Sequence, residues 1–110
     1  MNVLDSIGQQ MADNAIILYM KGTPERPQCG FSARAVKCLQ DCGVEFASVD
    51  VLNPDIRESL SKHSGWPTFP QFFINGELIG GSDILVEMHD SGELEPLLRS
   101  AINQDQGDIV

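Results

Sequence analysis

The chain has 110 residues, of which 42% are hydrophobic, and a formal net charge of −9 from 16 acidic and 7 basic residues. One domain of this length buries a core without disulfides or a structural metal, and its acidic balance leaves no basic surface for the phosphates of a nucleic acid. No apolar run approaches the roughly 18 residues of a membrane span, and residues 1–10 lack a signal-peptide pattern. A basic protein partner remains an alternative to the simpler interpretation of the charge, a solvated acidic surface.

Hydrophobic periodicity and turn residues predict nine elements in the order α-β-α-β-α-β-β-α-α. The predicted helices cover residues 1–14, 33–42, 54–63, 83 or 84 to about 90, and 94–102, and the predicted strands cover residues 15–20, 46–51, 71–74 and 77–79. A βαβ unit followed by a hairpin and closing helices indicates an α/β fold, with a mixed sheet between helices on both faces.

Several element boundaries carry specific signals. Asn53 is expected to cap the third helix, and Asn75-Gly76 is typical of a tight β-hairpin turn. Ser82 or Asp83 is expected to cap the fourth helix. Residues 103–110 are polar and acidic and are expected to form a flexible tail.

The functional interpretation depends on Cys29. It follows the first predicted strand and a Gly/Pro-rich loop, and it stands just before the second predicted helix. Ligand sites of open α/β sheets lie beyond the carboxyl ends of parallel strands, and a helix start favours a thiolate through its dipole and unpaired N–H groups. We therefore expect an exposed thiol of low pKa rather than an inert buried cysteine, with Lys21 as a candidate second source of positive charge.

The other two cysteines do not provide a partner for that thiol. Ser32 stands three residues after Cys29, where a dithiol motif places its second cysteine. Cys38 and Cys42 are four residues apart on one helix face, and we interpret them as small core residues rather than as a disulfide or metal ligands. The two histidines of the chain lack ligand spacing and are expected at the surface. Three cysteines, an odd number, indicate a reducing compartment.

Two further motifs suit a small ligand. A cis Phe69–Pro70 bond would turn the backbone of Phe69 outward, free to pair with an extended ligand, although only about one X–Pro bond in twenty is cis. Gly80-Gly81 leads into a helix N-terminus, whose N–H groups bind carboxylates or phosphates. Asp83 in the first turn would cap the helix or meet an ammonium group. N–H donors beside a carboxylate suit the zwitterionic end of an amino acid.

Four motifs in this order resemble those of monothiol glutaredoxins. They are Lys21-Gly22-Thr23-Pro24, the CGFS signature Cys29-Gly30-Phe31-Ser32, Trp66-Pro67-Thr68-Phe69-Pro70-Gln71 and Gly80-Gly81-Ser82-Asp83. The resemblance extends from about Leu4 to Ile102 and is to the short class typical of bacteria and mitochondria. It implies a thioredoxin fold with a four-stranded mixed sheet, in a single glutaredoxin domain of residues 1–110. It also implies a bacterial cytoplasm, with the mitochondrial matrix as the alternative.

The resemblance further implies glutathione as the bound small molecule. The residues implied to contact it are Lys21 and Arg57 for its glycine carboxylate, the backbone of Phe69 beside a cis Pro70 for its cysteinyl moiety, and Ser82 and Asp83 for its γ-glutamyl group. Many members of the family carry cysteine at the position of Ser82, so a disulfide between that position and Cys29 is not expected here.

Two functions are consistent with this pattern. A [2Fe–2S] cluster takes four ligands, which are generally thiolates. In the family's cluster-bridged homodimer, two copies of the residue equivalent to Cys29 and two glutathione thiols supply them. The preferred prediction is therefore cluster assembly and transfer and iron homeostasis, with acceptor proteins and a BolA-like protein as partners. The alternative is a glutathione-dependent monothiol oxidoreductase acting on glutathionylated proteins, a reaction at which family members are generally poor.

Overall fold

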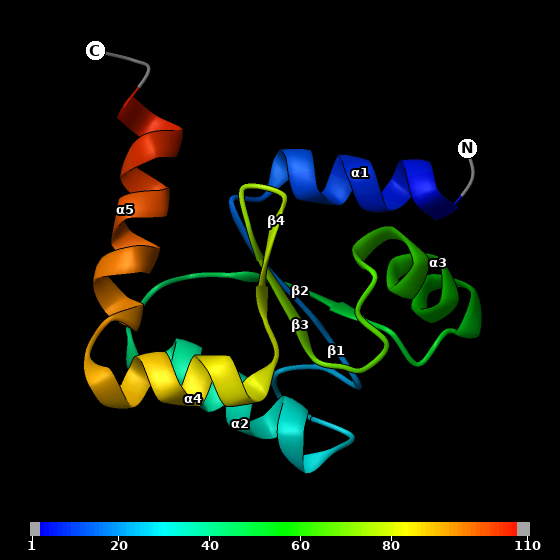
Figure 1. The fold of residues 1–110 in the computed structure, drawn as a ribbon, viewed down its shortest axis with the longest axis horizontal. Helices are drawn as coiled ribbons and strands as arrows, with labels where there is room; N and C mark the ends of the chain where they lie inside the picture. The colour runs from blue at the N-terminus through cyan, green and yellow to red at the C-terminus, as the bar shows by residue number, and fades with distance from the viewer. Residues whose placement is uncertain (1–2, 108–110) are drawn as a thin grey trace.

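The computed structural model describes the backbone of residues 3–107 and the side chains of residues 6–102 (Figure 1). Its helices are α1 (Val3–Asp13), α2 (Gly30–Asp41), α3 (Pro54–Ser64), α4 (Ser82–Ser91) and α5 (Leu94–Gly107). Its strands are β1 (Ile16–Met20), β2 (Ala47–Asp50), β3 (Gln71–Ile74) and β4 (Glu77–Gly80). The order of elements agrees with the prediction. Residues 1–2 of the first predicted helix and residues 108–110 of the expected tail lie outside the described residues.

The four strands form one mixed sheet in the order β2-β1-β3-β4. β1 pairs parallel with β2 and antiparallel with β3, and β3 pairs antiparallel with β4. Asn75 and Gly76, at φ 51° and 81°, form the turn between β3 and β4. Both residues adopt the left-handed backbone conformation that a tight two-residue hairpin turn requires. The predicted hairpin is therefore confirmed.

Neighbouring residues of the central strands belong to opposite cores. Leu18 of β1 and Phe72 of β3 pack with residues of α2, α4 and α5, whereas Tyr19 and Phe73 pack with residues of α1 and α3. This alternation follows from the two-residue period of a strand. Both faces of β1 and β3 are buried, which is why both strands are apolar apart from Gln71 at the start of β3, and the predicted helices on both faces are confirmed.

The start of α2 differs from the prediction. The helix begins at Gly30, three residues before the predicted start at Ala33, because Cys29 adopts an extended conformation and acts as its N-cap. The thiol therefore lies at the helix terminus itself, where the first-turn N–H groups are within reach.

The boundaries of the last two helices also differ. The N-cap of α4 is Gly81, so the prediction that Ser82 or Asp83 caps this helix is wrong. Ser82 and Asp83 lie in the first turn, because the carbonyl of Gly81 already accepts the first helical hydrogen bond, from Leu85 N–H at 3.2 Å. The helix α5 continues through residues 103–107 of the expected tail.

Candidate functional site

The loop between β1 and α2 doubles back on itself and ends at Cys29. Gly22 and Pro27 form an isolated antiparallel bridge within it. Gln28 donates its backbone N–H to the carbonyl of Lys21 at 2.8 Å. These contacts hold the residue before Cys29 against the residue that follows β1, so the thiol lies beyond the carboxyl end of that strand, as expected.

Cys29 is partly exposed and contacts Ser32 through two groups. Its Sγ accepts the backbone N–H of Ser32 at 3.3 Å, and the hydroxyl of Ser32 lies 3.3 Å from the same sulfur. An N-cap side chain normally accepts such an N–H through an oxygen. Here a sulfur fills that position, so the helix start serves the thiolate directly.

These contacts lower the pKa of Cys29 below its ordinary value of 9.0. Partial burial is the largest single influence and acts upward. The hydrogen bonds from the Ser32 hydroxyl and from the backbone N–H groups of Ser32 and Phe31, together with the charge of Lys21, outweigh it. The lowered pKa agrees with the expectation from the position at a helix start.

Ser32 is a functional residue that the sequence reasoning missed. Its side chain is fully buried, and its Oγ accepts the backbone N–H of Lys21 at 3.1 Å. Because this oxygen already accepts from Lys21, its own proton is free to point at the sulfur of Cys29. The spacing could have indicated this role, since the third residue of a helix commonly hydrogen-bonds its cap.

A groove of about 420 Å³ begins at Phe31, two residues after Cys29. Its walls are Phe31, most of the segment 66–70 and residues 81–84 at the start of α4. The structure thus brings together three residues that the resemblance assigned to glutathione, which are Phe69, Ser82 and Asp83.

The segment before β3 is held in one conformation. The Phe69–Pro70 bond is cis, which resolves the alternative that the sequence left open. Gln71 is fully buried, and its side-chain amide donates to the carbonyls of Trp66 at 2.7 Å and Thr68 at 3.2 Å. Within the described residues, the backbone of Phe69 makes no hydrogen bond, so its N–H and carbonyl are available to an extended ligand.

The start of α4 forms the opposite wall of the groove. Its N-cap, Gly81, provides no side-chain cap, so the first-turn N–H groups are not paired by a cap. Ser82 is buried and Asp83 is exposed in this turn. Gly80 has φ 154°, and a Cβ atom there would lie 2.7 Å from the side chain of Ile84. Glycine therefore allows β4 to turn directly into this helix.

The two cationic residues of the predicted site lie outside the groove. Arg57 lines a separate hollow of about 500 Å³ together with Lys62 and Pro67. Segment 66–70 contributes to both hollows, so it separates Arg57 from the groove. Lys21 lines neither hollow and acts on Cys29 through its charge.

The remaining thiols and histidines are arranged as structural residues. Cys38 and Cys42 are buried and free, as predicted. Burial is the main cause that raises the pKa of each thiol, and nearby carboxylates add to it. His63 is exposed, whereas His89 is partly covered and lies 3.4 Å from Asp41. Among the described residues, no group of three His, Cys, Asp or Glu side chains could hold a metal ion.

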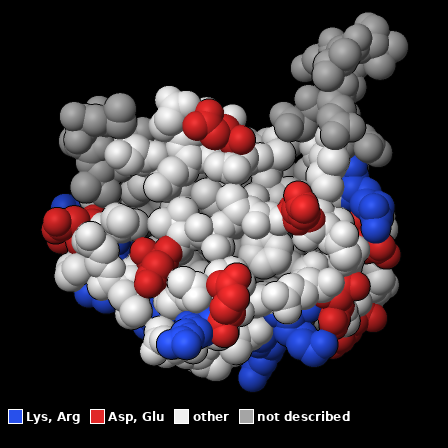
Figure 2. Space-filling view, turned by 180° about the vertical axis from the view of Figure 1, so that it is seen from behind, with Lys and Arg blue, Asp and Glu red and all other residues white. Residues whose placement is uncertain are grey.

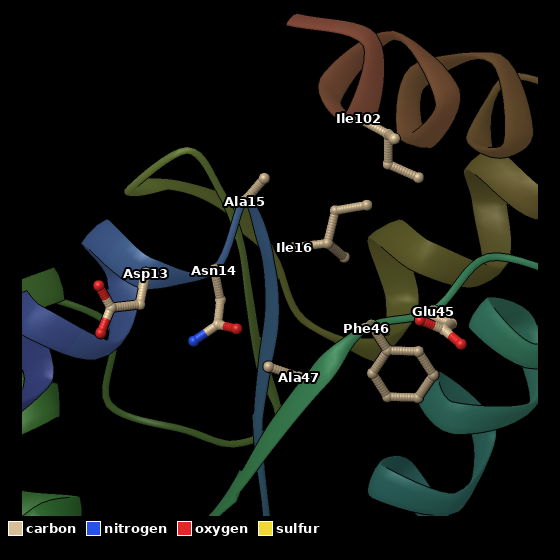
Figure 3. A pocket seen from close by; sticks show the side chains of 8 residues that line it. All are labelled: Asp13, Asn14, Ala15, Ile16, Glu45, Phe46, Ala47 and Ile102. Carbon is tan, nitrogen blue, oxygen red and sulfur yellow. The ribbon is translucent and has the colours of Figure 1, made fainter. Parts of the chain in front are cut away.

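Another hollow, of about 370 Å³, lies at the opposite end of the strands from Cys29 (Figure 3). It surrounds the amino ends of β1 and β2, where Ile16 and Phe46 form its apolar part and Asp13 and Glu45 its acidic part. The carboxyl end of β1 leads to Cys29, so this hollow is remote from the thiol. No predicted site residue lines it.

The surface agrees with the charge analysis on the face that Figure 2 shows. Acidic side chains are scattered over it, and Lys and Arg side chains lie along its margin, without a continuous basic area. Over the described part of the chain, no helix has the length and hydropathy to cross a membrane.

Comparison with known proteins agrees with the fold and the motifs. Residues 16–79 match the family model "Glutaredoxin". The probable monothiol glutaredoxin GrlA of Legionella pneumophila is 67% identical over 87 residues, which cover 78% of this chain and 98% of that protein. Glutaredoxin 4 of Escherichia coli is 55% identical over 97 residues, covering 87% and 84% of the two chains. A crystal structure of a buckwheat glutaredoxin–glutathione complex superposes with a TM-score of 0.78 at 26% identity, covering 90% and 89%. The chain therefore belongs to the glutaredoxin family, and within it to the monothiol glutaredoxins.

Proposed function

We propose that the protein carries a [2Fe–2S] cluster in a homodimer and acts in cluster assembly and transfer and in iron homeostasis. The observation that carries this proposal is the isolation of Cys29. It is the partly exposed thiol of lowered pKa, whereas Cys38 and Cys42 are both buried. Because a [2Fe–2S] cluster takes four ligands, one chain supplies one of them. Two chains and two glutathione thiols complete the set.

We place glutathione in the groove beside Phe31. The unpaired backbone of Phe69 supports a pairing with the cysteinyl moiety, and the start of α4 supports binding of the γ-glutamyl carboxylate and amine by Ser82 and Asp83. Lys21 and Arg57 remain the proposed partners of the glycine carboxylate. Because Arg57 lines the adjoining hollow, to which Pro67 also contributes, this end of glutathione would extend past segment 66–70 to reach it.

The side chains around the groove support a covered, dimeric arrangement. Phe31 is 56% exposed and Trp66 39% exposed, and Ile84 is similarly open beside them. Adjacent exposed apolar side chains commonly mark a protein interface. A second copy bound through a shared cluster would cover this surface and exclude water from the thiolates. A BolA-like protein is a proposed substitute for the second copy, and cluster acceptor proteins would use the same face. The bacterial relatives favour a cytoplasmic location.

The second candidate function is glutathione-dependent reduction of glutathionylated proteins. Cys29 would attack a mixed disulfide, and glutathione would then regenerate the thiolate. The lowered pKa of Cys29 favours this chemistry as well. Ser32 in place of a second thiol leaves only the monothiol route.

Anaerobic reconstitution separates the two functions. The protein is incubated with iron, sulfide and glutathione, and its visible spectrum and solution mass are recorded. The cluster proposal predicts a brown dimer that is lost in Cys29→Ser and when glutathione is omitted. A colourless monomer with rapid turnover in a glutathione-coupled reductase assay would reject the cluster proposal and support the second function.

A further inference from the structure

We infer that Asp50 is a positioning residue for Cys29, although it lies on a different strand and does not touch the thiol. Asp50 is the last residue of β2. A single oxygen of its carboxylate, Oδ1, accepts the backbone N–H of Gly22 at 3.0 Å and that of Leu52 at 2.9 Å. It therefore ties the loop that leads to Cys29 to the end of the neighbouring strand.

Two short routes connect this anchor to the thiol. Lys21, next to the anchored Gly22, donates its N–H to Ser32 Oγ at 3.1 Å, and that hydroxyl lies 3.3 Å from the sulfur of Cys29. The carbonyl of Lys21 accepts the N–H of Gln28, the residue before Cys29, at 2.8 Å. A shift of the loop would disturb both routes together.

The position of Asp50 explains why an anchor is needed. Met20 and Asp50 are the last paired residues of β1 and β2, and beyond them Val51 still donates to the carbonyl of Met20 at 2.8 Å. The two chains then separate, and the carboxylate supplies the next link between them. Gly22 has φ 90°, and a Cβ atom there would collide with the carbonyl of Arg26, so the anchored segment is tightly folded.

A direct electrostatic role would have the opposite effect. A carboxylate near a thiolate disfavours it, so removing the charge of Asp50 would make Cys29 more reactive. Loss of positioning makes Cys29 less reactive, because the hydroxyl of Ser32 and the charge of Lys21 are no longer held in place. The two roles therefore predict opposite changes in the reactivity of Cys29 when Asp50 is replaced by alanine.

The inference rests on the proposed use of Cys29 as a thiolate, but its test needs neither cluster nor glutathione. The rate of alkylation of the reduced protein by iodoacetamide at neutral pH is compared among variants, with mass spectrometry restricting the signal to Cys29. Thermal unfolding and amide hydrogen exchange at Gly22 are measured in parallel. Asp50→Asn keeps an accepting oxygen without the charge. Asn53→Ala is the matched control, because Asn53 caps α3 through Asp55 N–H at 2.9 Å and is not connected to the loop.

We expect Asp50→Ala to alkylate at least about threefold more slowly, since the rate follows the thiolate fraction, and to exchange faster at Gly22. Asp50→Asn should retain the wild-type rate, and Asn53→Ala should lose stability without losing reactivity. If Asp50→Ala fails to fold, Asp50→Glu replaces it, because the longer side chain displaces the oxygen and should slow alkylation similarly. An unchanged rate in the Ala or Glu variant, a slowed Asn variant, or faster alkylation in Ala and Asn would overturn the inference. A protein that shows the expected rates yet forms no cluster would leave the inference standing and reject the cluster proposal alone.

Discussion

The hydroxyl of Ser32 lies 3.3 Å from the sulfur of Cys29 and accepts the backbone N–H of Lys21 from its other side. The serine at the position of a second thiol is thus a hydrogen-bond donor to the thiolate. Its role is the opposite of a resolving cysteine, because it stabilises the reduced, ionised state of Cys29 and cannot form a disulfide with it.

The first prediction concerns that hydroxyl. Ser32→Ala should raise the pKa of Cys29, because one of the donors to the thiolate is lost while the backbone N–H donors remain. The thiolate absorbance followed against pH measures this directly. Ser48→Ala, at an exposed position of β2, is the control. A pKa that does not move in Ser32→Ala would show that the backbone donors alone are sufficient.

The second prediction concerns stability against pH. The native pKa of Cys29 lies below the 9.0 of an ordinary thiol. Between these two pKa values, the unfolded chain keeps the thiol proton that the native chain has lost. Stability from this group is therefore fully present above pH 9.0 and is lost as the pH falls through the native pKa. The unfolding free energy of the wild type relative to Cys29→Ser should increase as the pH rises toward 9.0, as measured by urea unfolding. A difference that is flat with pH would contradict the lowered pKa.

The third prediction concerns Tyr19, which is the only tyrosine of the chain. Burial raises its pKa to about 12 from an ordinary value of 10.0, and its hydroxyl donates to Gln10 Oε1 at 2.9 Å. An alkaline absorbance titration should show no phenolate near pH 10 while the protein stays folded. The same titration in urea should return the ordinary value. Phenolate formation near pH 10 in the folded protein would mean that the ring is accessible to solvent.

The fourth prediction concerns Gln71. Gln71→Leu releases the carbonyls of Trp66 and Thr68, so glutathione should bind about fivefold more weakly, equivalent to roughly 1 kcal/mol for the lost hydrogen bonds. Gln71 Oε1 is buried without a partner in the described part of the chain, and leucine removes that cost. Thermal stability should therefore change little while affinity falls.

The fluorescence of Trp66 measures this affinity, because it is the only tryptophan of the chain and lines the groove. Gln40→Leu, on the exposed face of α2, is the control. Equal affinity of Gln71→Leu and the wild type would show that segment 66–70 does not need its amide clamp.

The fifth prediction concerns the buried thiols. Cys38→Ser and Cys42→Ser should each lose about 1–3 kcal/mol of stability, because a hydroxyl is placed among apolar neighbours. Neither should change the colour of the reconstituted protein. Loss of colour in either folded variant would mean that the cluster ligands have been misassigned.

Much of the fold could be predicted because its signals are local. Segment 16–20 and the apolar residues 72–74 lie in strands whose two faces are both buried, and Asn75-Gly76 forms the predicted turn. Cys29 could be placed at a helix start for the same reason, since the loop, the cap and the first turn are adjacent in sequence. The predicted starts of α2 and α4 were wrong because a different residue is the N-cap of each helix. Which residue caps a helix depends on backbone conformation as well as on residue type.

The groove itself required the tertiary structure, because its walls come from three segments far apart in the chain. The sequence could not show that Phe69 and Asp83 face one groove while Arg57 lines a different hollow, since that depends on the path of segment 66–70. The isomer of the Phe69–Pro70 bond was likewise left open by the sequence.

The sequence by itself determined that this protein has one activated thiol at a helix start, Cys29, and no resolving cysteine three residues later. Only the tertiary structure decided how the loop before that thiol is held, through the bond from Lys21 N–H to Ser32 Oγ and through the anchor that Asp50 provides 28 residues from Gly22. The physical reason is the separation along the chain of the residues that make each contact. A helix start, its dipole and its first-turn donors arise from neighbouring residues, whereas the contacts that hold the loop at Lys21 and Gly22 come from elements that meet only when the chain folds.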